Sequence, residues 1–258
     1  MDIQLVPIEQ FQTFLLCFSR VMAILAAVPV INSRQAPPQV RIGLGFATAL
    51  LLFPLMASHT PKIDFSLMEF ALVMANEILI GLLLGLVAQL IFTAVSFGGT
   101  IIGYQMGFAA ANIFDPQTTQ QLSIMSQFSN IISILIFLAL NLHHIFFKVI
   151  VDSYILLPPG TLDFSSGAIP LLMDLAGHMF LLSIKLSAPI LALLLISNLV
   201  LGILARIFPQ LNVFMLSFPM NIGIALLVIG LTLHILPLML SREFDTMGEN
   251  FFRLFQML

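Results

Sequence analysis

The stretch Arg206-Ile207-Phe208-Pro209-Gln210-Leu211-Asn212 divides two long apolar segments near the carboxyl end of the chain. Proline has no backbone N–H to donate and disfavours helical geometry in the residue before it, so Pro209 prevents one continuous helix. The polar side chains around it provide turn chemistry. The sequence therefore predicts a helical hairpin with arms at 186–206 and 211–240. The residues assigned to its turn are Arg206, Pro209, Gln210, Asn212 and Phe214.

The composition places this hairpin in a membrane protein. The chain has 258 residues, of which 60% are hydrophobic and 8% are charged, whereas an average soluble domain is about 45–50% apolar and about 25% charged. A soluble fold of this size could not bury so much apolar surface. The same hydrophobicity excludes intrinsic disorder, and the single cysteine excludes a disulfide scaffold. Nine Lys and Arg scattered among twelve Asp and Glu form no basic patch for nucleic acid.

Apolar blocks follow one another along the chain, and none alternates as a strand would. The six blocks are 11–31, 43–58, 67–97, 122–147, 169–200 and 211–240. A spanning helix needs about 20 apolar residues, so the second block is short, and the third and fifth are long enough for kinked or hairpin arrangements. Breaks are expected where proline or paired glycine occurs, at Pro37-Pro38, Pro61, Gly98-Gly99, Pro158-Pro159-Gly160 and Pro209. The predicted fold is all-α, built of membrane-associated helical hairpins.

The signals that orient membrane helices are weak in this chain. If all blocks span, the two sets of alternate loops hold similar numbers of Lys and Arg: Arg34, Arg41 and Arg206 against Lys62, Lys148, Arg242 and Arg253. Most polytopic proteins concentrate these residues on the cytoplasmic side and carry an aromatic belt, but this chain has no Trp and two Tyr. Two interpretations stay open. The chain is an ordinary six-span protein with poor signals, or its blocks pack against other subunits instead of crossing lipid.

A few charged residues lie inside the apolar blocks, where each would be costly in lipid and should face protein or water. They are Arg20, Glu69, Glu77 and Lys185. A proton-coupled transporter usually clusters such groups. Here they are scattered singly, which favours structural pairing or interface contacts over a proton relay.

The sequence contains no constellation typical of catalysis or metal binding. Cys17 lies within an apolar block and is interpreted as a small core residue. His143 and His144 would point about 100° apart on a helix, and no nearby Cys or acid completes a ligand set. The sequence therefore predicts no enzyme, no metal and no cofactor.

Glycines recur every four residues at Gly99, Gly103 and Gly107 and form a helical ridge without side chains. Small residues at this spacing let helix backbones approach closely in membranes, and glycine also lowers the cost of bending. The segment is therefore interpreted as a close-packed helix that breaks. Gly81 and Gly85 repeat the spacing once, and ordinary helix packing is the favoured interpretation there.

An apolar loop is expected between this ridge and the next helix. Asp115 followed by Pro116 is typical of a helix N-cap and first helical position, so residues 108–115 should connect two helices. The loop is rich in Ala and Phe, and an apolar loop should be covered. Either it packs inside the protein as core, or it plugs a cavity. In the second case the apolar bulk would come from Met106, Phe108, Ile113 and Phe114.

Small polar side chains form one stripe on the helix after Asp115. They are Thr119, Ser123, Ser126, Asn130 and Ser133, spaced four, three, four and three residues apart. Such groups can hydrogen-bond across helices, or they can line a wet passage without fixed charge. The stripe alone favours bonding between helices.

The carboxyl-terminal tail from Ser241 mixes charged residues with phenylalanines. Arg242, Glu243, Asp245, Glu249 and Arg253 lie between Phe244, Phe251, Phe252 and Phe255. This pattern predicts an amphipathic helix on a surface or against a partner.

Several of these motifs strongly resemble the flagellar biosynthetic protein FliR family. The most specific is the segment 202–214 with Phe218-Pro219 after it. The glycine ridge followed by Gln105-Met106-Gly107-Phe108 and Asp115-Pro116 is also similar to that family. So is Asn141-Leu142-His143-His144, although the family typically has Gly where this chain has Leu142. The resemblance covers essentially the whole chain.

The resemblance implies a subunit of a protein-export gate. FliR belongs to the inner-membrane gate of the bacterial flagellar type III secretion apparatus, where it assembles with several copies of FliP and FliQ into a helical ring, lifted largely out of the bilayer. An FlhB subunit associates with the gate, and unfolded export substrates pass through its centre. The expected location is the cell inner membrane in the flagellar basal body. The expected partners are membrane lipid and FliP-like, FliQ-like and FlhB-like subunits.

The resemblance also implies a division of the chain. Residues 1–185 correspond to a FliP-like helical unit, and residues 186–258 to a FliQ-like hairpin with the amphipathic tail. The family's plug loop matches the segment near 106–116. The candidate gate residues are then Met106, Gly107, Phe108, Asn112, Ile113, Phe114, Asp115 and Pro116, with Gly99 and Gly103 packed closely behind them.

The leading alternative from another class is a small-solute secondary transporter. Such a protein should show an inverted internal repeat and ionisable groups at the membrane midplane, and neither is clear in this chain. An intramembrane enzyme comes third, because no candidate catalytic group is present.

Overall fold

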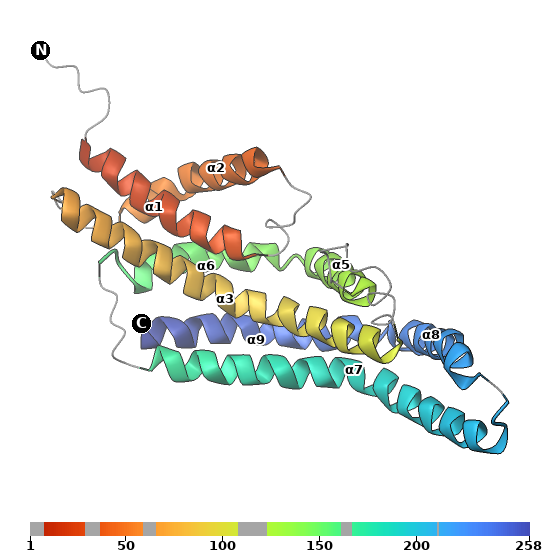
Figure 1. Ribbon diagram of the computed structural model, residues 1–258. Coiled ribbons are helices and arrows are strands. Elements are labelled where there is room, and N and C mark those ends of the chain that lie inside the picture. The colour runs from red at the N-terminus through yellow and green to blue at the C-terminus, as the bar shows by residue number, and fades with distance from the viewer. Residues whose placement is uncertain (1–7, 29–36, 59–65, 108–122, 161–166, 211) are drawn as a thin grey trace, which may run out of the picture. The chain divides into compact units, whose positions relative to one another are not determined.

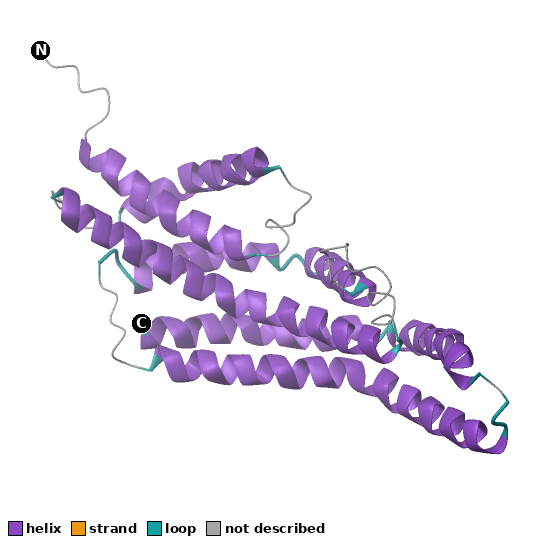
Figure 2. Ribbon diagram, viewed as in Figure 1, coloured by secondary structure: helices purple, strands orange, loops and turns teal. Residues whose placement is uncertain are grey.

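Helices make up nearly all of the described chain. The computed structural model describes residues 8–28, 37–58, 66–107, 123–160, 167–210 and 212–258 (Figure 1). Its helices are α1 (Ile8–Ala27), α2 (Pro38–Ala57), α3 (Leu67–Gln105), α5 (Ile124–Ala139), α6 (His143–Leu156), α7 (Ala168–Ile207), α8 (Val213–Thr232) and α9 (Leu236–Met257). Figure 2 shows no strand among these residues. The prediction of an all-α fold is confirmed.

Several helices in the described part of the chain are long and apolar enough to cross a membrane. There are five, namely α1, α2, α3, α7 and α8, and a sixth span if α5 and α6 form one bent pair. The helix α3 has 39 residues and α7 has 40, so at a rise of 1.5 Å per residue each is about 60 Å long. The hydrocarbon core of a bilayer is only about 30 Å thick. The prediction of membrane-associated helices is confirmed, and two of these helices are about twice as long as a bilayer core requires.

The break predicted at Gly98-Gly99 is wrong, because α3 continues through both glycines to Gln105. A Cβ atom at Gly98 would lie 3.0 Å from the carbonyl oxygen of Ser183, and one at Gly99 would lie 2.8 Å from that of Met125. Neighbouring helices therefore cover the bare backbone, and this contact offsets the entropy that glycine loses in a helix. The chain leaves the helix about two turns later than predicted, at Gly107.

The apolar block 122–147 forms two helices instead of one. Leu140 N donates to Ile136 O at 2.9 Å at the end of α5, and α6 begins at His143. Asn141 lies between them with φ at +54°, the left-handed region that Asn tolerates better than most residues. The turn forms without the glycine that the FliR family typically has at position 142, because the preceding Asn supplies the left-handed residue.

The block 211–240 is also divided, because α8 ends at Thr232 and α9 begins at Leu236. Pro237 explains the break. It has no N–H to donate to the Leu233 carbonyl and its ring would clash with that group, whereas proline is well tolerated in the first turn of a new helix. The second arm of the hairpin is therefore shorter than predicted, and the amphipathic helix begins inside the predicted apolar block.

The helix α9 has the amphipathic pattern predicted for the tail, and its apolar face packs within the chain itself. The buried side chains are Phe244, Met247, Phe251 and Leu254. The ring centroid of Phe251 lies 6.1 Å from that of Phe146 in α6. On the other face, Arg242, Asp245, Glu249 and Arg253 are exposed.

The chain packs as two compact units. Unit 1 comprises Met1–Leu90, Asn141–Leu175 and Phe244–Leu258, and unit 2 comprises Ile91–Leu140 and Ala176–Glu243. The FliP-like and FliQ-like division at 185/186 falls inside α7 and stays a prediction.

In unit 1, α1 lies against α3 where both helices carry small residues. A Cβ atom at Gly81 would lie 2.5 Å from the Cβ of Ala23, and one at Gly85 would overlap Ala27. The interpretation of Gly81 and Gly85 as ordinary helix packing is confirmed. On α1, Phe14 also meets Phe46 and Phe53 of α2, with ring centroids 5.5 and 5.7 Å away.

We predict that Asn141→Val destabilises the protein and that Asn141→Gly does not. A residue with a branched Cβ is penalised in the left-handed conformation by about 1–2 kcal/mol, whereas glycine adopts it readily. The temperature at which the detergent-extracted protein loses its helical circular dichroism should fall for the valine variant only. Equal melting temperatures for the two variants would contradict this turn geometry.

Candidate functional site

The candidate gate segment begins where α3 ends, in unit 2. Met106 N donates to Ile102 O at 2.9 Å, and Gly107 N donates to Tyr104 O at 3.0 Å. The Met106 side chain is fully buried, in an apolar cluster contributed by α3, α5, α7 and α8. The other members of this cluster are Ile102, Met125, Ile190, Leu194, Ala225 and Val228. The structure therefore places Met106 in the core of unit 2.

Gly107 is the last described residue before the predicted loop, and its φ is +91°. The ring of Phe218 in α8 lies directly against it, because a Cβ atom at position 107 would be 2.6 Å from Cδ1 of that ring. The remaining predicted gate residues lie outside the described residues. They are Phe108, Asn112, Ile113, Phe114, Asp115 and Pro116.

A seam of small residues joins α3 to α5 beside this turn. A Cβ atom at Gly99 would lie 2.8 Å from Ser126 Cα, and one at Gly103 would overlap the Ser123 hydroxyl. Further along, the rings of Phe92 and Phe137 meet edge to face at 5.5 Å. These contacts run in opposite directions along the two helices, so α3 and α5 are antiparallel neighbours within unit 2.

Only some residues of the predicted polar stripe face this seam between α3 and α5. Ser126 and Ser133 are buried, Asn130 is half-buried, and Thr119 lies outside the described residues. The hydroxyls of Ser123 and Ser133 are buried and have no hydrogen-bond partner among the described residues. Ser123 packs closely against Gly103, and neither hydroxyl makes a hydrogen bond between helices among the described residues.

A cavity of about 50 Å³ lies beside the seam in unit 2. Its wall includes Gly98, Gly99, Ser129 and Thr232, and none of its lining residues is charged. The Thr232 hydroxyl donates to the backbone oxygen of Val228 at 2.9 Å. The cavity therefore has no charged side chain in its wall with which to bind a charged solute.

The predicted hairpin turn is confirmed in position, because α7 ends at Ile207 and α8 begins at Val213. The Asn212 side chain caps α8 by accepting a hydrogen bond from Met215 N at 3.3 Å. The predicted turn residues Arg206, Pro209 and Gln210 are exposed. Phe214 lies in the first turn of α8.

A buried polar link holds the two arms of the hairpin together, and sequence reasoning missed it. The Ser197 hydroxyl donates to Asn221 Oδ1 at 3.1 Å, and Asn221 Nδ2 donates to Asn198 Oδ1 at 3.0 Å. Both Ser197 and Asn221 are buried. Isolated polar residues facing each other across two apolar helices were the available signal, since such groups need a partner in a membrane protein.

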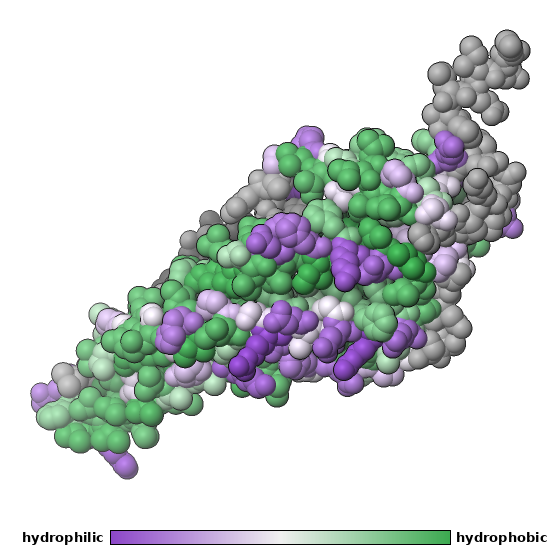
Figure 3. All heavy atoms as spheres, turned by 180° about the vertical axis from the view of Figure 1, so that it is seen from behind, coloured by the Kyte–Doolittle hydropathy of each residue, from purple (hydrophilic) through white to green (hydrophobic). Residues whose placement is uncertain are grey.

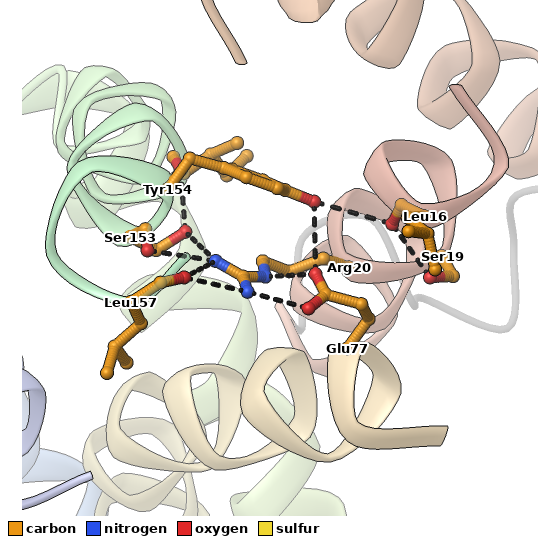
Figure 4. Close-up of polar contacts among 8 residues, drawn as sticks. Leu16, Ser19, Arg20, Glu77, Ser153, Tyr154 and Leu157 are labelled. Carbon is orange, nitrogen blue, oxygen red and sulfur yellow. Dashed lines mark hydrogen bonds and ion pairs between the residues drawn. The ribbon is translucent and has the colours of Figure 1, made fainter. Parts of the chain in front are cut away.

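The strongest electrostatic feature is a buried ion pair in unit 1 (Figure 4). Arg20 of α1 holds Glu77 of α3 through two bonds of 2.7 and 2.9 Å. The guanidinium also donates to the backbone oxygens of Ser153 and Leu157 at 2.9 and 3.0 Å, where α6 ends. Its centre lies 4.1 Å from the centroid of the Tyr154 ring. The prediction that Arg20 and Glu77 serve structural pairing is confirmed.

The other charged residues of the apolar blocks behave differently. Glu69 forms a capping box with Ser66 at the start of α3, in which Ser66 N donates to its carboxylate at 2.9 Å. Lys185 is exposed near the middle of α7. Among the described residues, no group of three or more His, Cys, Asp or Glu is placed to hold a metal ion.

Comparison with known proteins identifies the family. Residues 11–247 match the family described as Bacterial export proteins, family 1. The chain is 36% identical over 236 residues to "Flagellar biosynthetic protein FliR" of Pectobacterium carotovorum subsp. carotovorum, with 90% of each chain covered. The chain belongs to the FliR family of bacterial export proteins.

Two further relatives agree with this assignment to the FliR family. The chain is 31% identical over 246 residues to "Flagellar biosynthetic protein FliR" of Bacillus subtilis (strain 168), covering 94% of both chains. It is 34% identical over 212 residues to the protein of that name from Escherichia coli (strain K12), covering 81% of this chain and 80% of that one. The resemblance inferred from the motifs is confirmed.

For this FliR-family chain we predict that Arg20→Leu is strongly destabilising. Removing one partner of a buried ion pair leaves an uncompensated charge and costs about 3–5 kcal/mol. Replacing both partners, in Arg20→Leu with Glu77→Leu, removes that charge and should recover much of the loss. The measurement is the melting temperature and yield of detergent-extracted protein. A single variant as stable as the unchanged chain would show that the pair is dispensable.

We also predict that Gly99→Ala disrupts the seam and that Gly177→Ala does not. A Cβ at Gly99 would meet backbone atoms of α5 at 2.8 Å, whereas one at Gly177 in α7 has nothing within 4 Å. Alanine is favoured over glycine inside a helix by about 1 kcal/mol, so the control variant should be neutral or more stable. Protease resistance in detergent would compare them, and equal resistance would argue against tight packing at the seam.

Proposed function

We propose that this chain is a subunit of the export gate of the flagellar type III secretion apparatus. With FliP-like and FliQ-like subunits it forms the channel through which unfolded flagellar proteins cross the inner membrane, at the base of the flagellum. An FlhB-like subunit associates with this gate. In this assignment the chain transports proteins and performs no catalysis.

The observation that carries the proposal is the length of the apolar helices. Both α3 and α7 contain a window of 18 residues that is apolar enough to cross a membrane, and each helix is about 60 Å long, against about 30 Å of hydrocarbon in a bilayer. Lipid can therefore cover about half of each helix. The remaining length of each helix must be covered by protein or water, and its many exposed apolar side chains support a subunit of a larger helical assembly over a lone transporter.

The exposed surface of the chain supports the same proposal. Only 22% of the apolar window in α7 and 17% of that in α2 is buried within the chain, and Figure 3 shows large apolar areas on the surface, interrupted by hydrophilic patches. Lys185 is exposed on α7 next to the exposed Ile184. A charged side chain at that place would be costly in lipid. The face of α7 that carries Lys185 is therefore expected to contact protein or water.

Within this proposal the segment 106–116 closes the resting channel. Bulky apolar groups at a constriction exclude water and ions without a specific binding site, and the segment continues from a firmly packed helix end at Met106 and Gly107. Ser123 and Ser126 of the polar stripe pack against Gly103 and Gly99 where α3 ends. The turn at Arg206–Asn212 serves as a contact with a neighbouring subunit.

The proposal predicts that the chain is stable only with its partners. Expressed alone, it should aggregate or be degraded, because much of the apolar surface of α2, α7 and α8 is not buried within the chain. Expressed together with FliP-like and FliQ-like subunits of the same organism, it should be extracted in detergent as one complex, whose mass is measured. The same cells should recover flagellin secretion into the medium when their own FliR is deleted.

Two outcomes would contradict the proposal. One is a monodisperse, protease-resistant monomer from the chain expressed alone. The other is a deletion strain that secretes no flagellin although the complex is assembled. Solute uptake by vesicles that hold the lone chain would favour a transporter.

A further inference from the structure

Charged side chains bound an uncharged stretch in the second half of α7. Lys185 and Arg206 are both exposed, and none of the residues from 186 to 205 carries a charge. At a rise of 1.5 Å per residue this stretch is about 30 Å long, which is the thickness of the hydrocarbon core of a bilayer. The second half of α7 therefore has the length of one membrane crossing, with a cation at each end.

The other arm of the hairpin matches this stretch in length and in its lack of charge. The helix α8 has 20 residues, so it is also about 30 Å long, and none of its residues is charged. The next ionisable residue is His234, which is exposed. Ser197 of α7 bonds to Asn221 of α8 near the middle of each arm, so the two uncharged stretches lie side by side.

Polar side chains within these stretches find hydrogen-bond partners inside the hairpin. The hydroxyls of Ser187 and Thr232 donate to backbone oxygens one turn earlier, at 2.9 Å in each case. In the middle of the hairpin, Ser197, Asn198 and Asn221 are joined to one another. Hydrocarbon offers no hydrogen-bond partner, so polar groups placed there must be satisfied by the protein itself. These five side chains meet that requirement.

The outward side chains of both arms are apolar. Leu195, Leu199 and Ile203 of α7 are each more than half exposed, and so are Leu226 and Leu231 of α8. An apolar surface of this extent is unfavourable in water. Hydrocarbon matches the chemistry of these side chains as well as the length of the two arms.

The part of α7 that precedes Lys185 has a different surface. His178, about two turns earlier, is half-exposed, and its Nε2 atom lies 2.7 Å from a carboxylate oxygen of Glu243 in α9. Ionisable groups are costly to place in lipid. The surface of α7 therefore changes at Lys185, from one that carries ionisable groups to one that carries none before Arg206.

We propose that residues 186–205 and α8 form the lipid-contacting hairpin of this chain. Its outward side chains face the acyl chains of the bilayer, with Lys185 at one edge of the hydrocarbon and Arg206 at the other. Long basic side chains at these edges can reach the headgroups. The part of α7 before Lys185 lies outside the hydrocarbon. This inference goes beyond the export role, because it follows from the charges, lengths and hydrogen bonds of the hairpin itself.

The test uses membranes that hold the assembled complex, with single cysteines carrying a fluorophore that nitroxide-bearing lipids quench on contact. The background is Cys17→Ala, with partner subunits that lack cysteine. Leu193→Cys reports on α7 and Leu226→Cys on α8. The matched control is Leu181→Cys, one turn before Lys185 on the same helix, because Leu181 is 49% exposed and Leu193 is 44% exposed.

Labels at Leu193 and Leu226 should lose most of their fluorescence when the lipid carries the nitroxide near the end of its acyl chain. The label at Leu181 should keep its fluorescence. A label at Ile203, close to Arg206, should be quenched more strongly by a nitroxide near the headgroup than by one near the end of the acyl chain. Leu199→Cys gives a second reading on α7 if Leu193→Cys does not assemble.

Two results would overturn the proposal. Bright labels on both arms would show that protein covers the hairpin. Quenching at Leu181 as strong as at Leu193 would show that lipid extends past Lys185. A complex whose labels are quenched as expected, but which secretes no flagellin, would support the lipid contact and count against the export role alone.

Discussion

Helix length is the constraint on which the other features of this chain depend. Two apolar helices of 39 and 40 residues extend about twice the thickness of a bilayer's hydrocarbon core. Lipid cannot cover that length, and the chain covers only part of it. The chain has no Trp and two Tyr, so it lacks the aromatic belt that is typical of helices that end at a lipid–water interface.

Within each unit, the chain holds its long helices together by two different means. In unit 2 the means is geometric, since Gly99 and Gly103 let α5 approach the α3 backbone closely. In unit 1, Gly81 and Gly85 likewise let α1 approach α3 closely, and an electrostatic contact is added, since Arg20 joins Glu77 to the end of α6. The bidentate ion pair, the carbonyl acceptors and the Tyr154 ring together satisfy a charge that would otherwise be very costly to bury. Lys185, by contrast, is exposed on α7 and is not enclosed by an ion-pair partner and carbonyl acceptors as Arg20 is. Its charge would be costly in lipid, so this face of α7 is expected to contact protein or water.

Features set by local chemistry could be predicted from the sequence. The turn at Pro209, its cap at Asn212 and the all-α fold depend on residues close in the chain. The behaviour of Gly98-Gly99 could not be predicted, because glycine breaks a helix or continues it according to whether another helix covers it. The break at Asn141 was missed because Asn supplied the left-handed residue in place of glycine, and the break before Leu236 because Pro237 lies in an otherwise apolar run.

Contacts between distant residues were the least accessible to sequence reasoning. Arg20 and Glu77 were recognised as costly charges, but no local pattern pairs residues 57 positions apart or adds the carbonyls at the end of α6. The contact of Phe218 with Gly107 also joins residues that are far apart in the sequence, and no local pattern predicts it. Most of the candidate gate lies outside the described residues, so its role is proposed from the family and from the packing of Met106 and Gly107.

The central claim is that protein, and not lipid, covers about half of α7. The most direct measurement is a scan of single spin-labelled cysteines along exposed positions of α7 in the assembled complex, with Cys17→Ala as the background. Accessibility to oxygen, which concentrates in lipid, is compared with accessibility to a water-soluble nickel chelate. The account predicts one lipid-exposed stretch of no more than about 20 residues, with the remaining positions shielded from lipid. High oxygen accessibility at exposed positions along the whole of α7 would contradict it.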